Sequence, residues 1–535
     1  MRILPVLLLI IILNSVDAQQ WIPDLGNGKY KNPVIWADYS DPDVIRVGED
    51  FYMTASSFNC VPALPILYST DLVNWELINH AVKRFPDSYF DIVQHGNGVW
   101  APSLRFVNGW FYIYWGDPDR GIYMVRTQDP RGEWSGPVLV KKAYGNIDPC
   151  PLWDNDASLP DMKGKVYLVH AFANSRAGVS NILQINELTG DGSSIGQERR
   201  VIINGYPNHN TIEGPKFYKR NGYYYIFAPA GGVAGGYQMV FRSKNVNGPY
   251  DERIVLAQGK TKINGPHQGG WVELENGENW FIHFQELQPY GRLVHLQPVK
   301  WIDDWPVMGV DDDNDGTGEP VTEFQKPKVK KATFVKIPQT SDEFNDNKIN
   351  LAWQWQANPY DNWYSIDQKT GMLRLYAQYN SNPHSVWMVP NLLLQKFPAP
   401  IFDATTKINI QNLKNSEKVG LIIMGLDYAS LTVSPAKEGY NLILTTCKNA
   451  YDGTDEKILE RIDFNASEIY MGVKVDYLGK CQFSYSKDGK NYLNVGDVFQ
   501  AREGRWIGAK VGIFATSSSE TGLKGYADYD WFRIE

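Results

Sequence analysis

Three acidic residues occupy comparable places in repeated segments of the sequence. Asp41 and Asp148 each stand directly before a proline, and Glu213 lies two residues before Pro215. A pair of carboxyl groups with opposed protonation states can cleave a glycosidic bond, one as base or nucleophile and the other as acid. A third carboxylate beside the acid would raise the pKa of that acid by like-charge repulsion and keep it protonated near neutral pH. These residue types therefore fit acid–base hydrolysis of a sugar bond.

The same residues also have an ordinary structural interpretation. An Asp before Pro is common in turns, where its carboxylate accepts a hydrogen bond from a nearby backbone N–H. The residue before Pro is Ala101 in one repeat and Gly214 in another, so the turn does not require an acid. The repeats by themselves leave catalysis and turn capping as equal alternatives.

Five segments share one plan, in which a Pro- or Gly-rich turn opens a short apolar strand and a polar turn leads to an aromatic strand. They are residues 41–53, 101–112, 148–168, 213–225 and 269–282. Asn-Gly between aromatic and β-branched residues, as at Asn108-Gly109 and Asn221-Gly222, is a strong signal for a tight hairpin. The repeats predict an all-β fold with a five-bladed β-propeller over residues 22–310.

In a propeller, the first strand of each blade lines the central channel. The residues that open the five repeats should therefore meet at one rim of that channel. They are Asp41, Trp100, Asp148, Glu213 and His267. Residues that are far apart in the sequence would in this way form one site.

The rest of the chain divides into a linker and a second β domain. Residues 311–338 begin with an acidic run, Asp311 to Gly316, and continue with Pro and Lys, a composition typical of a linker. The acidic run resembles a calcium loop, but Thr322 stands at its twelfth position, where a bidentate Glu is required, so a solvated turn is favoured. Alternating strands such as Met471–Val475 predict a β-sandwich over residues 339–535.

Composition supports this organisation and excludes one class of partner. A chain of 535 residues is too long for one core, and its 47 Gly and 31 Pro punctuate short strands. The net charge of −8 argues against nucleic-acid binding, because phosphate recognition needs clustered Lys and Arg.

The N-terminus predicts export. Arg2 precedes an apolar run from Ile3 to Leu13, and Val16 and Ala18 are small residues suited to a cleavage site. Because the run is shorter than the ~20 residues that span a bilayer, residues 1–18 are typical of a signal peptide and not of a membrane span. We expect a periplasmic or secreted protein with no membrane span.

The cysteines leave two alternatives open. In an oxidising compartment they could pair, or they could remain as buried thiols, and four are too few to form a disulfide framework for a chain of this length. They are Cys60, Cys150, Cys447 and Cys481.

Ordered motifs along nearly the full mature chain resemble glycoside hydrolase family 43, in particular its β-xylosidases and α-L-arabinofuranosidases with a C-terminal concanavalin-like sandwich. The motifs are Ser40-Asp41-Pro42-Asp43, Asp71-Leu72-Val73-Asn74-Trp75, Trp100-Ala101-Pro102-Ser103, Ile147-Asp148-Pro149, Glu213-Gly214-Pro215-Lys216, Gly291-Arg292, Trp353-Gln354-Trp355 and Asp528-Tyr529-Asp530-Trp531-Phe532. The resemblance implies exo-acting hydrolysis that releases arabinofuranosyl or xylosyl units from plant cell-wall polysaccharides or oligosaccharides.

The resemblance also implies an inverting mechanism with one role for each acid. Asp41 would be the general base that activates water, Glu213 the general acid, and Asp148 the residue that orients Glu213 and modulates its pKa. Asp43 is a rival for the base, since it lies two residues on and on the same strand face. Many relatives carry Ser at that position, which favours Asp41.

Several residues around the acids are candidates for binding the sugar or an ion. Trp100 would be a sugar platform or pocket wall, although Trp at the start of a strand is also common packing. Arg292 matches a family position where a cation steadies the charges of the acids. Further substrate-binding candidates are Phe58, Ser175, Arg176 and Gln268.

A calcium ion in the channel is the one metal that the resemblance suggests, and the reaction itself requires no cofactor. His267 matches a channel histidine that contacts calcium or its water shell in some relatives. The surrounding Gly265–Gly269 segment departs from the usual Gly-His-Gly.

Two other functions remain as alternatives. A non-catalytic sugar-binding propeller is disfavoured because all three acids are present. An endo-acting arabinanase is disfavoured because the sandwich usually accompanies exo-acting relatives. The expected partners are arabinose- or xylose-containing oligosaccharides; the sequence fixes neither which sugar leaves nor the oligomeric state.

Overall fold

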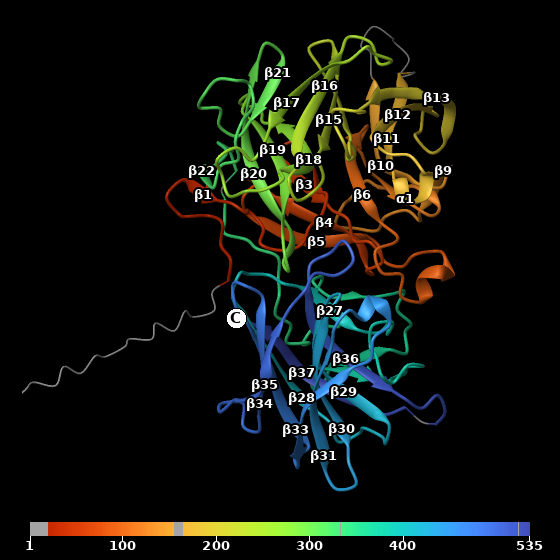
Figure 1. Cartoon of the computed structure of the whole chain (residues 1–535), viewed down its shortest axis with the longest axis vertical. Coiled ribbons are helices and arrows are strands. Elements are labelled where there is room, and N and C mark those ends of the chain that lie inside the picture. The colour runs from red at the N-terminus through yellow and green to blue at the C-terminus, as the bar shows by residue number, and fades with distance from the viewer. Residues whose placement is uncertain (1–19, 155–163, 332, 523) are drawn as a thin grey trace, which may run out of the picture.

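The computed structural model describes residues 20–154, 164–331, 333–522 and 524–535. The signal peptide predicted at residues 1–18 lies outside these ranges. Figure 1 shows two parts stacked along the long axis, a ring of small sheets formed by the N-terminal half and a two-sheet domain formed by the C-terminal half. Helical structure in the described residues is limited to α1 (Asn174–Ala177) and the 3-10 turns Ser88–Asp91 and Ala450–Asp452.

The ring consists of five antiparallel four-stranded sheets, each built from consecutive strands. Blade 1 comprises β2 (Asp43–Val47), β3 (Asp50–Thr54), β4 (Ala63–Ser69) and β5 (Trp75–Val82). Blade 2 comprises β6 (Trp100–Val107), β7 (Trp110–Asp117), β8 (Gly121–Thr127) and β9 (Val138–Lys142). Blade 3 comprises β10 (Asn146–Asp154), β11 (Lys165–Phe172), β12 (Ile182–Leu188) and β13 (Ile195–Asn204). Blade 4 comprises β14 (Lys216–Arg220), β15 (Tyr223–Ala230), β16 (Tyr237–Ser243) and β17 (Asp251–Leu256). Blade 5 comprises β18 (His267–Glu273), β19 (Asn279–Leu287), β20 (Gly291–Ile302) and β21 (Trp305–Met308).

The predicted five-bladed propeller is therefore confirmed. Its hairpins form where the sequence indicated. Asn108 and Gly109 both have positive φ, 51° and 80°, as do Asn221 and Gly222, 49° and 76°. Two successive positive φ values match the twist of the flanking strands, and Asn-Gly is the dipeptide that adopts them most easily.

Every blade opens on a bend, a residue whose φ lies in the left-handed region. The bend residues are Asp41 (φ 54°), Ala101 (36°), Asp148 (55°), Gly214 (58°) and Gln268 (40°). In β6, β10 and β18 the bend coincides with a register shift in the strand pairing, and such bulges re-aim side chains beside active sites. A non-glycine residue held in this region costs about 1–3 kcal/mol, so the surrounding structure has to hold the bend.

The segment 311–338, expected as a linker, returns to the propeller for part of its length. Gly318 pairs with Leu256 of β17, and Glu319 pairs with Val310. Further on, β22 (Glu323–Gln325) forms a two-stranded sheet with β1 (Lys29–Lys31). These contacts join the start of the propeller to the segment that follows its last blade.

The C-terminal domain consists of two facing antiparallel sheets. In spatial order, one contains β23 (Gln354–Trp355), β27 (Leu393–Lys396), β36 (Lys510–Ser517), β29 (Glu417–Met424), β30 (Tyr428–Pro435), β31 (Tyr440–Cys447) and β32 (Lys457–Phe464), and β26 (Gln378–Tyr379) joins β36 in parallel. The other contains β24 (Tyr364–Asp367), β25 (Met372–Tyr376), β37 (Tyr526–Ile534), β28 (Phe402–Asn409), β33 (Glu468–Val475), β34 (Lys480–Ser486) and β35 (Leu493–Gln500).

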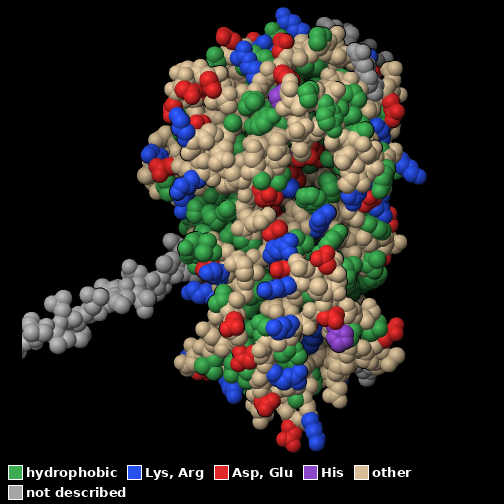
Figure 2. All heavy atoms as spheres, in the orientation of Figure 1, with side chains coloured by type: hydrophobic (Ala, Val, Ile, Leu, Met, Phe, Trp, Pro, Cys, Tyr) green, Lys and Arg blue, Asp and Glu red, His purple; other side chains and the backbone are tan. Residues whose placement is uncertain are grey.

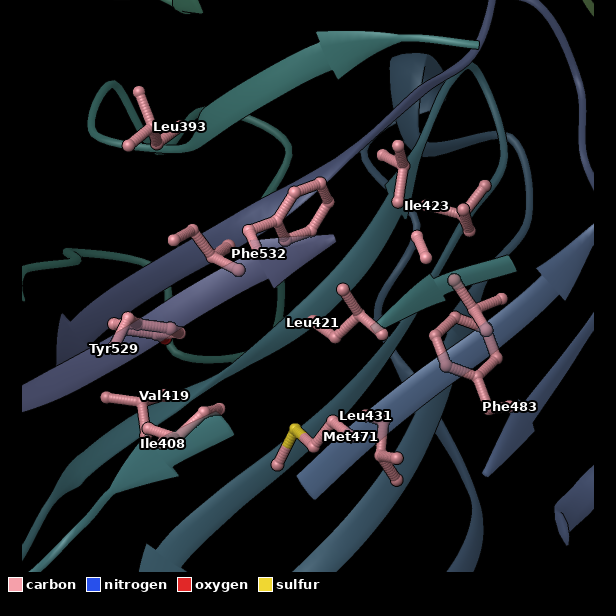
Figure 3. Close-up of a cluster of buried hydrophobic side chains, with 14 of the residues drawn as sticks. Leu393, Ile408, Val419, Leu421, Ile423, Leu431, Met471, Phe483, Tyr529 and Phe532 are labelled. Carbon is pink, nitrogen blue, oxygen red and sulfur yellow. The ribbon is translucent and has the colours of Figure 1, made fainter. Parts of the chain in front are cut away.

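Apolar side chains from both sheets meet in one core (Figure 3). Alternate residues Val419, Leu421 and Ile423 of β29 point inward, as the period of two in a strand requires. They face Met471 of β33 and Phe483 of β34 from the other sheet. The predicted concanavalin-like sandwich is confirmed.

The two domains share hydrogen bonds and part of their core. Val61 of the propeller and Trp355 of the sandwich exchange both backbone N–H···O bonds, at 3.0 and 2.6 Å. Tyr290 and Leu293 from blade 5 are buried within the sandwich core. The sandwich is therefore packed directly against the propeller.

All four cysteines are described, and each is buried and free, so they do not pair with one another. In the described part of the chain, no helix has the length and apolar character needed to cross a membrane.

Candidate active site

Three carboxyl groups from blades 1, 3 and 4 lie close enough to perturb one another at the rim of the propeller channel. Asp41 and Asp148 are themselves bend residues, whereas Glu213 stands one position before the bend at Gly214. Trp100 and His267 also stand one position before their bends. Figure 2 shows acidic side chains inside a hollow in the propeller half of the molecule.

The carboxyl group of Asp41 contacts two donors. Its Oδ2 accepts the hydroxyl of Ser56 at 2.6 Å, and its Oδ1 lies 3.1 Å from Nη1 of Arg292. Ser56 Oγ in turn accepts the backbone N–H of Ala101 at 2.7 Å, which links blade 1 to the bend of blade 2. Asp41 is buried, and the ion pair with Arg292 compensates for that burial.

Asp43, the rival for the base, has a different environment. Its Oδ2 accepts the backbone N–H of Leu104 and Nη1 of Arg105, both at 2.8 Å. Asp43 is completely buried, and these partners lie in β6 of the neighbouring blade. The contacts fit a residue that joins blades 1 and 2.

Asp148 and Glu213 are two buried acids whose charges affect each other. Burial raises the pKa of Asp148, while the N–H of Gly214, which donates to its Oδ2 at 2.7 Å, and the Lys216 ammonium oppose that rise. Burial and the charges of Asp148 and Asp41 raise the pKa of Glu213. Asp148 accepts the Gly214 N–H, whereas no described residue donates a hydrogen bond to the Glu213 carboxyl, so the protonated form is favoured more strongly at Glu213.

Two features of this loop require a glycine at the position of Gly214. Its φ of 58° is left-handed, and a Cβ at this position would lie 2.5 Å from Cδ of Gln268. Gln268 is buried at the bend of blade 5, and its Nε2 has no hydrogen-bond partner among the described residues. The Gln268 side chain therefore packs beside the Glu213-Gly214 loop.

Arg292 supplies the positive charge of the site. Its Nη1 contacts Asp41, and its Nε lies 3.8 Å from Oε1 of Glu286. Burial would lower the pKa of Arg292, but Asp41, Glu286 and Asp38 outweigh that effect and raise it. Arg292, which the sequence predicted to stabilise the charge of the acids, thus lies beside Asp41.

The aromatic candidates lie on the blade 2 side. Trp100 is half-buried and donates from Nε1 to Gly96 O at 2.8 Å. Phe58 is buried, and its ring meets the Trp100 ring edge-on with centroids 6.3 Å apart. Arg176 of α1 lies 6.0 Å above the same ring and donates to Ser175 Oγ at 3.0 Å.

Trp506 is a candidate that the sequence analysis missed. It lies in the sandwich loop between β35 and β36 and is 44% exposed. Its ring meets Trp100 edge-on, with centroids 6.1 Å apart. The sandwich therefore adds an aromatic side chain to the rim, and no local pattern around Trp506 signals this contact.

The surroundings of His267 bear on the prediction of a channel calcium ion. Both ring nitrogens of His267 lack a hydrogen-bond partner among the described residues, and burial lowers its pKa to about 3, so the ring is neutral. Its Nε2 lies 3.7 Å from Oε1 of Glu213. In the described residues, three His, Cys, Asp or Glu ligand atoms come together only at Asp311, Asp313 and Asp315 in an exposed loop. An ion at His267 would need water to complete its shell and stays a prediction.

The sequence matches two known domains in succession. Residues 30–306 match Glycosyl hydrolases family 43, and residues 341–535 match the Beta xylosidase C-terminal Concanavalin A-like domain. The chain is 38% identical to a putative beta-xylosidase of Xylanibacter ruminicola over 94% of this chain and 89% of that protein. It is 27% identical to a non-reducing end alpha-L-arabinofuranosidase of Bacteroides ovatus, over 95% of each chain.

A solved structure shows the same arrangement of domains. The GH43 BlXynB protein of Bacillus licheniformis is 25% identical and superposes with a TM-score of 0.79, over 95% of this chain and 99% of that one.

The propeller with its cluster of three carboxyl groups, together with these matches, defines a glycoside hydrolase that acts on carbohydrate. The chain belongs to glycosyl hydrolase family 43, and the predicted resemblance is confirmed.

Proposed function

We propose that this chain is an exo-acting, inverting glycosidase that removes terminal xylosyl units from xylose-containing oligosaccharides. The observation that carries the proposal is the contrast between its acids. Asp41 accepts a hydrogen bond from Ser56 and forms an ion pair with Arg292, whereas burial and like charge raise the pKa of Glu213. One ionised and one protonated carboxyl group is the combination that hydrolysis of a glycosidic bond requires.

Each residue then has a step in the reaction. Asp41 accepts a proton from the water that attacks the anomeric carbon. Glu213 gives its proton to the departing glycosidic oxygen, and Asp148 keeps that proton on Glu213 until the bond breaks. Arg292 stabilises the Asp41 carboxylate, and Trp100 offers an aromatic face to the sugar.

Xylose is the first candidate for the released sugar, because the relative that is 38% identical is named a putative beta-xylosidase and the one that is 29% identical is named a beta-xylosidase. Arabinofuranose is the second candidate, because the Bacteroides ovatus relative is named an alpha-L-arabinofuranosidase. Action at a chain end is supported by the name of the Bacteroides ovatus relative, which specifies the non-reducing end.

Proton NMR of the first product tests this proposal. With an aryl β-xyloside, the xylose that appears first should have the opposite anomeric configuration, because water attacks the face opposite the leaving group. Retained configuration would contradict the role of Asp41 as a base. Hydrolysis of an aryl α-L-arabinofuranoside alone would reassign the sugar, and no hydrolysis of either would favour a binding propeller.

Asp148→Asn should move the alkaline limb of the pH profile of kcat/KM to lower pH. The Asp148 charge raises the pKa of Glu213, so its removal lowers that pKa. Glu213 acts only when protonated, and activity is lost as the pH rises through its pKa, so the loss should begin at lower pH. Initial rates across the pH range, with thermal unfolding as a control for folding, measure the shift. An unmoved alkaline limb would contradict the assigned role of Asp148.

Export to the periplasm or the medium is a further part of the proposal, supported by the apolar run from Ile3 to Leu13.

A further inference from the structure

The sandwich forms hydrogen bonds with the turn between β19 and β20, immediately before Arg292. The backbone N–H of Ala509 donates to Pro289 O at 2.8 Å. The hydroxyl of Tyr290 lies 2.7 Å from Pro400 O and 2.6 Å from Asp476 O, both in the sandwich. The strand that carries Arg292 therefore begins at a point fixed by the second domain.

Asp38 connects this contact between the domains to the active site. Its Oδ1 accepts the backbone N–H of Arg292 at 2.9 Å, and its Oδ2 accepts the backbone N–H of Gly508 from the sandwich at 3.2 Å. The backbone N–H of Tyr39 donates to Arg292 O at 3.1 Å, so the backbone of Arg292 is bonded on both sides. Asp38 itself is only 3% exposed.

The backbone packs closely around this carboxylate, so that two neighbouring glycines have no room for a side chain. A Cβ on Gly291 would lie 2.6 Å from Oδ1 of Asp38 and 2.7 Å from the backbone N of Gly508. A Cβ on Gly508 would lie 2.5 Å from Tyr290 O. Two glycines from different domains thus meet at Asp38.

We propose that Asp38 is a positioning residue that transmits the placement of the sandwich, through Arg292, to the base Asp41. This inference rests on the proposed function, because it assumes that Asp41 activates water. The side chain of Arg292 extends from a backbone that Asp38 holds, and its Nη1 reaches Asp41 at 3.1 Å. The second domain is then part of the catalytic support.

Charge around Arg292 explains why its position needs this support. Glu286 lies 3.8 Å from Nε of Arg292, and Glu503 of the sandwich adds a further negative charge near Glu286. These carboxylates compete with Asp41 for one guanidinium group. Without Asp38, the N–H groups of Arg292 and Gly508 would lose a buried acceptor, and Arg292 would be free to turn toward Glu286. A displacement of about 1 Å can cost on the order of 10²-fold in rate.

Asp38→Asn in the full-length enzyme tests the inference. It keeps the size of the side chain but replaces one acceptor oxygen with an NH2 group. We expect kcat to fall by about 10–100-fold on both aryl xylosides and xylo-oligosaccharides, with KM little changed, because the base serves every substrate. In a double-mutant cycle, Asp38→Asn should add little to Arg292→Lys, because both act through the same ion pair.

Asn358→Ala is the matched control. Buried Asn358 of the sandwich accepts the backbone N–H of Phe85 at 2.8 Å and donates to Phe85 O at 3.0 Å, so its loss loosens the domain interface without touching Arg292. Equal activity of the Asp38→Asn and Asn358→Ala enzymes, or additive losses in the cycle, would overturn the inference. If Asp38→Asn does not fold, Asp38→Ser, which keeps one acceptor, takes its place under the same criteria. An inactive wild-type enzyme would instead overturn the proposed function, and the inference with it.

Discussion

Glu213→Ala should lose about 10²–10⁴-fold in kcat/KM on xylo-oligosaccharides while keeping much of the wild-type rate on dinitrophenyl xylosides. A sugar alkoxide leaves poorly without a proton, whereas a dinitrophenolate hardly needs one. Burial and the charges of Asp148 and Asp41 raise the pKa of Glu213, so the proton is available near neutral pH. Steady-state kinetics across leaving groups of graded basicity would measure the effect.

The slope of rate against leaving-group basicity is the decisive quantity. In the wild-type enzyme it should be shallow, and in Glu213→Ala it should be steep. Glu286→Gln is a useful control, since Glu286 is also a half-buried acid with a raised pKa near Arg292, but it is not assigned to proton transfer. If Glu213→Ala lost activity equally on every leaving group, Glu213 would not be the acid.

Asp41→Ala should lower activity on natural and activated substrates to the same extent. Every substrate needs an activated water, so a better leaving group does not help. The expected loss is about 10²–10⁴-fold on both types, and the variant also leaves Arg292 without its nearest carboxylate. Parallel assays on xylobiose and dinitrophenyl xyloside, with thermal unfolding to verify the fold, would show it.

Asp43→Asn separates the two candidates for the base. Asp43 accepts hydrogen bonds from Leu104 and Arg105 of the neighbouring blade. The Asp43→Asn enzyme should therefore lose thermal stability, while its kcat changes little. Activity that survives in Asp41→Ala but disappears in a folded Asp43→Asn enzyme would reverse the assignment.

The sequence predicted the fold because its signals are local and repeated. Asn108-Gly109 and Asn221-Gly222 need only their own backbone preferences to form hairpins, and the inward residues of β29 alternate as a strand dictates. Five copies of one signal made the propeller predictable. The propeller also indicated that the three acids would lie at one rim, because every blade opens there, but their catalytic roles came from the family resemblance.

Contacts between the domains could not be predicted in this way. Asp38 and Gly508 are bonded to each other, yet neither lies in a pattern that indicates the other. Trp506 stands in a loop whose sequence resembles any polar turn. The return of residues 318–325 to the propeller was missed because a Pro- and Lys-rich composition is typical of linkers, and only pairing with β1 and β17 shows that this part is ordered.

The repeated bend at the start of each blade has a consequence for how such a ring can vary. The backbone holds the same left-handed residue five times, and the side chain there or one position earlier belongs to the rim whether it is Asp, Glu, Trp, His or Gln. Exchanging that side chain alters the chemistry of the channel without changing strand length, pairing or register. When the blades are aligned by their bend residues and not by their acidic residues, Glu213 corresponds to Trp100 and Asp41 corresponds to Ala101. The chemistry of the channel therefore depends on single side chains at the bends, whereas the fold depends on the strands that surround them.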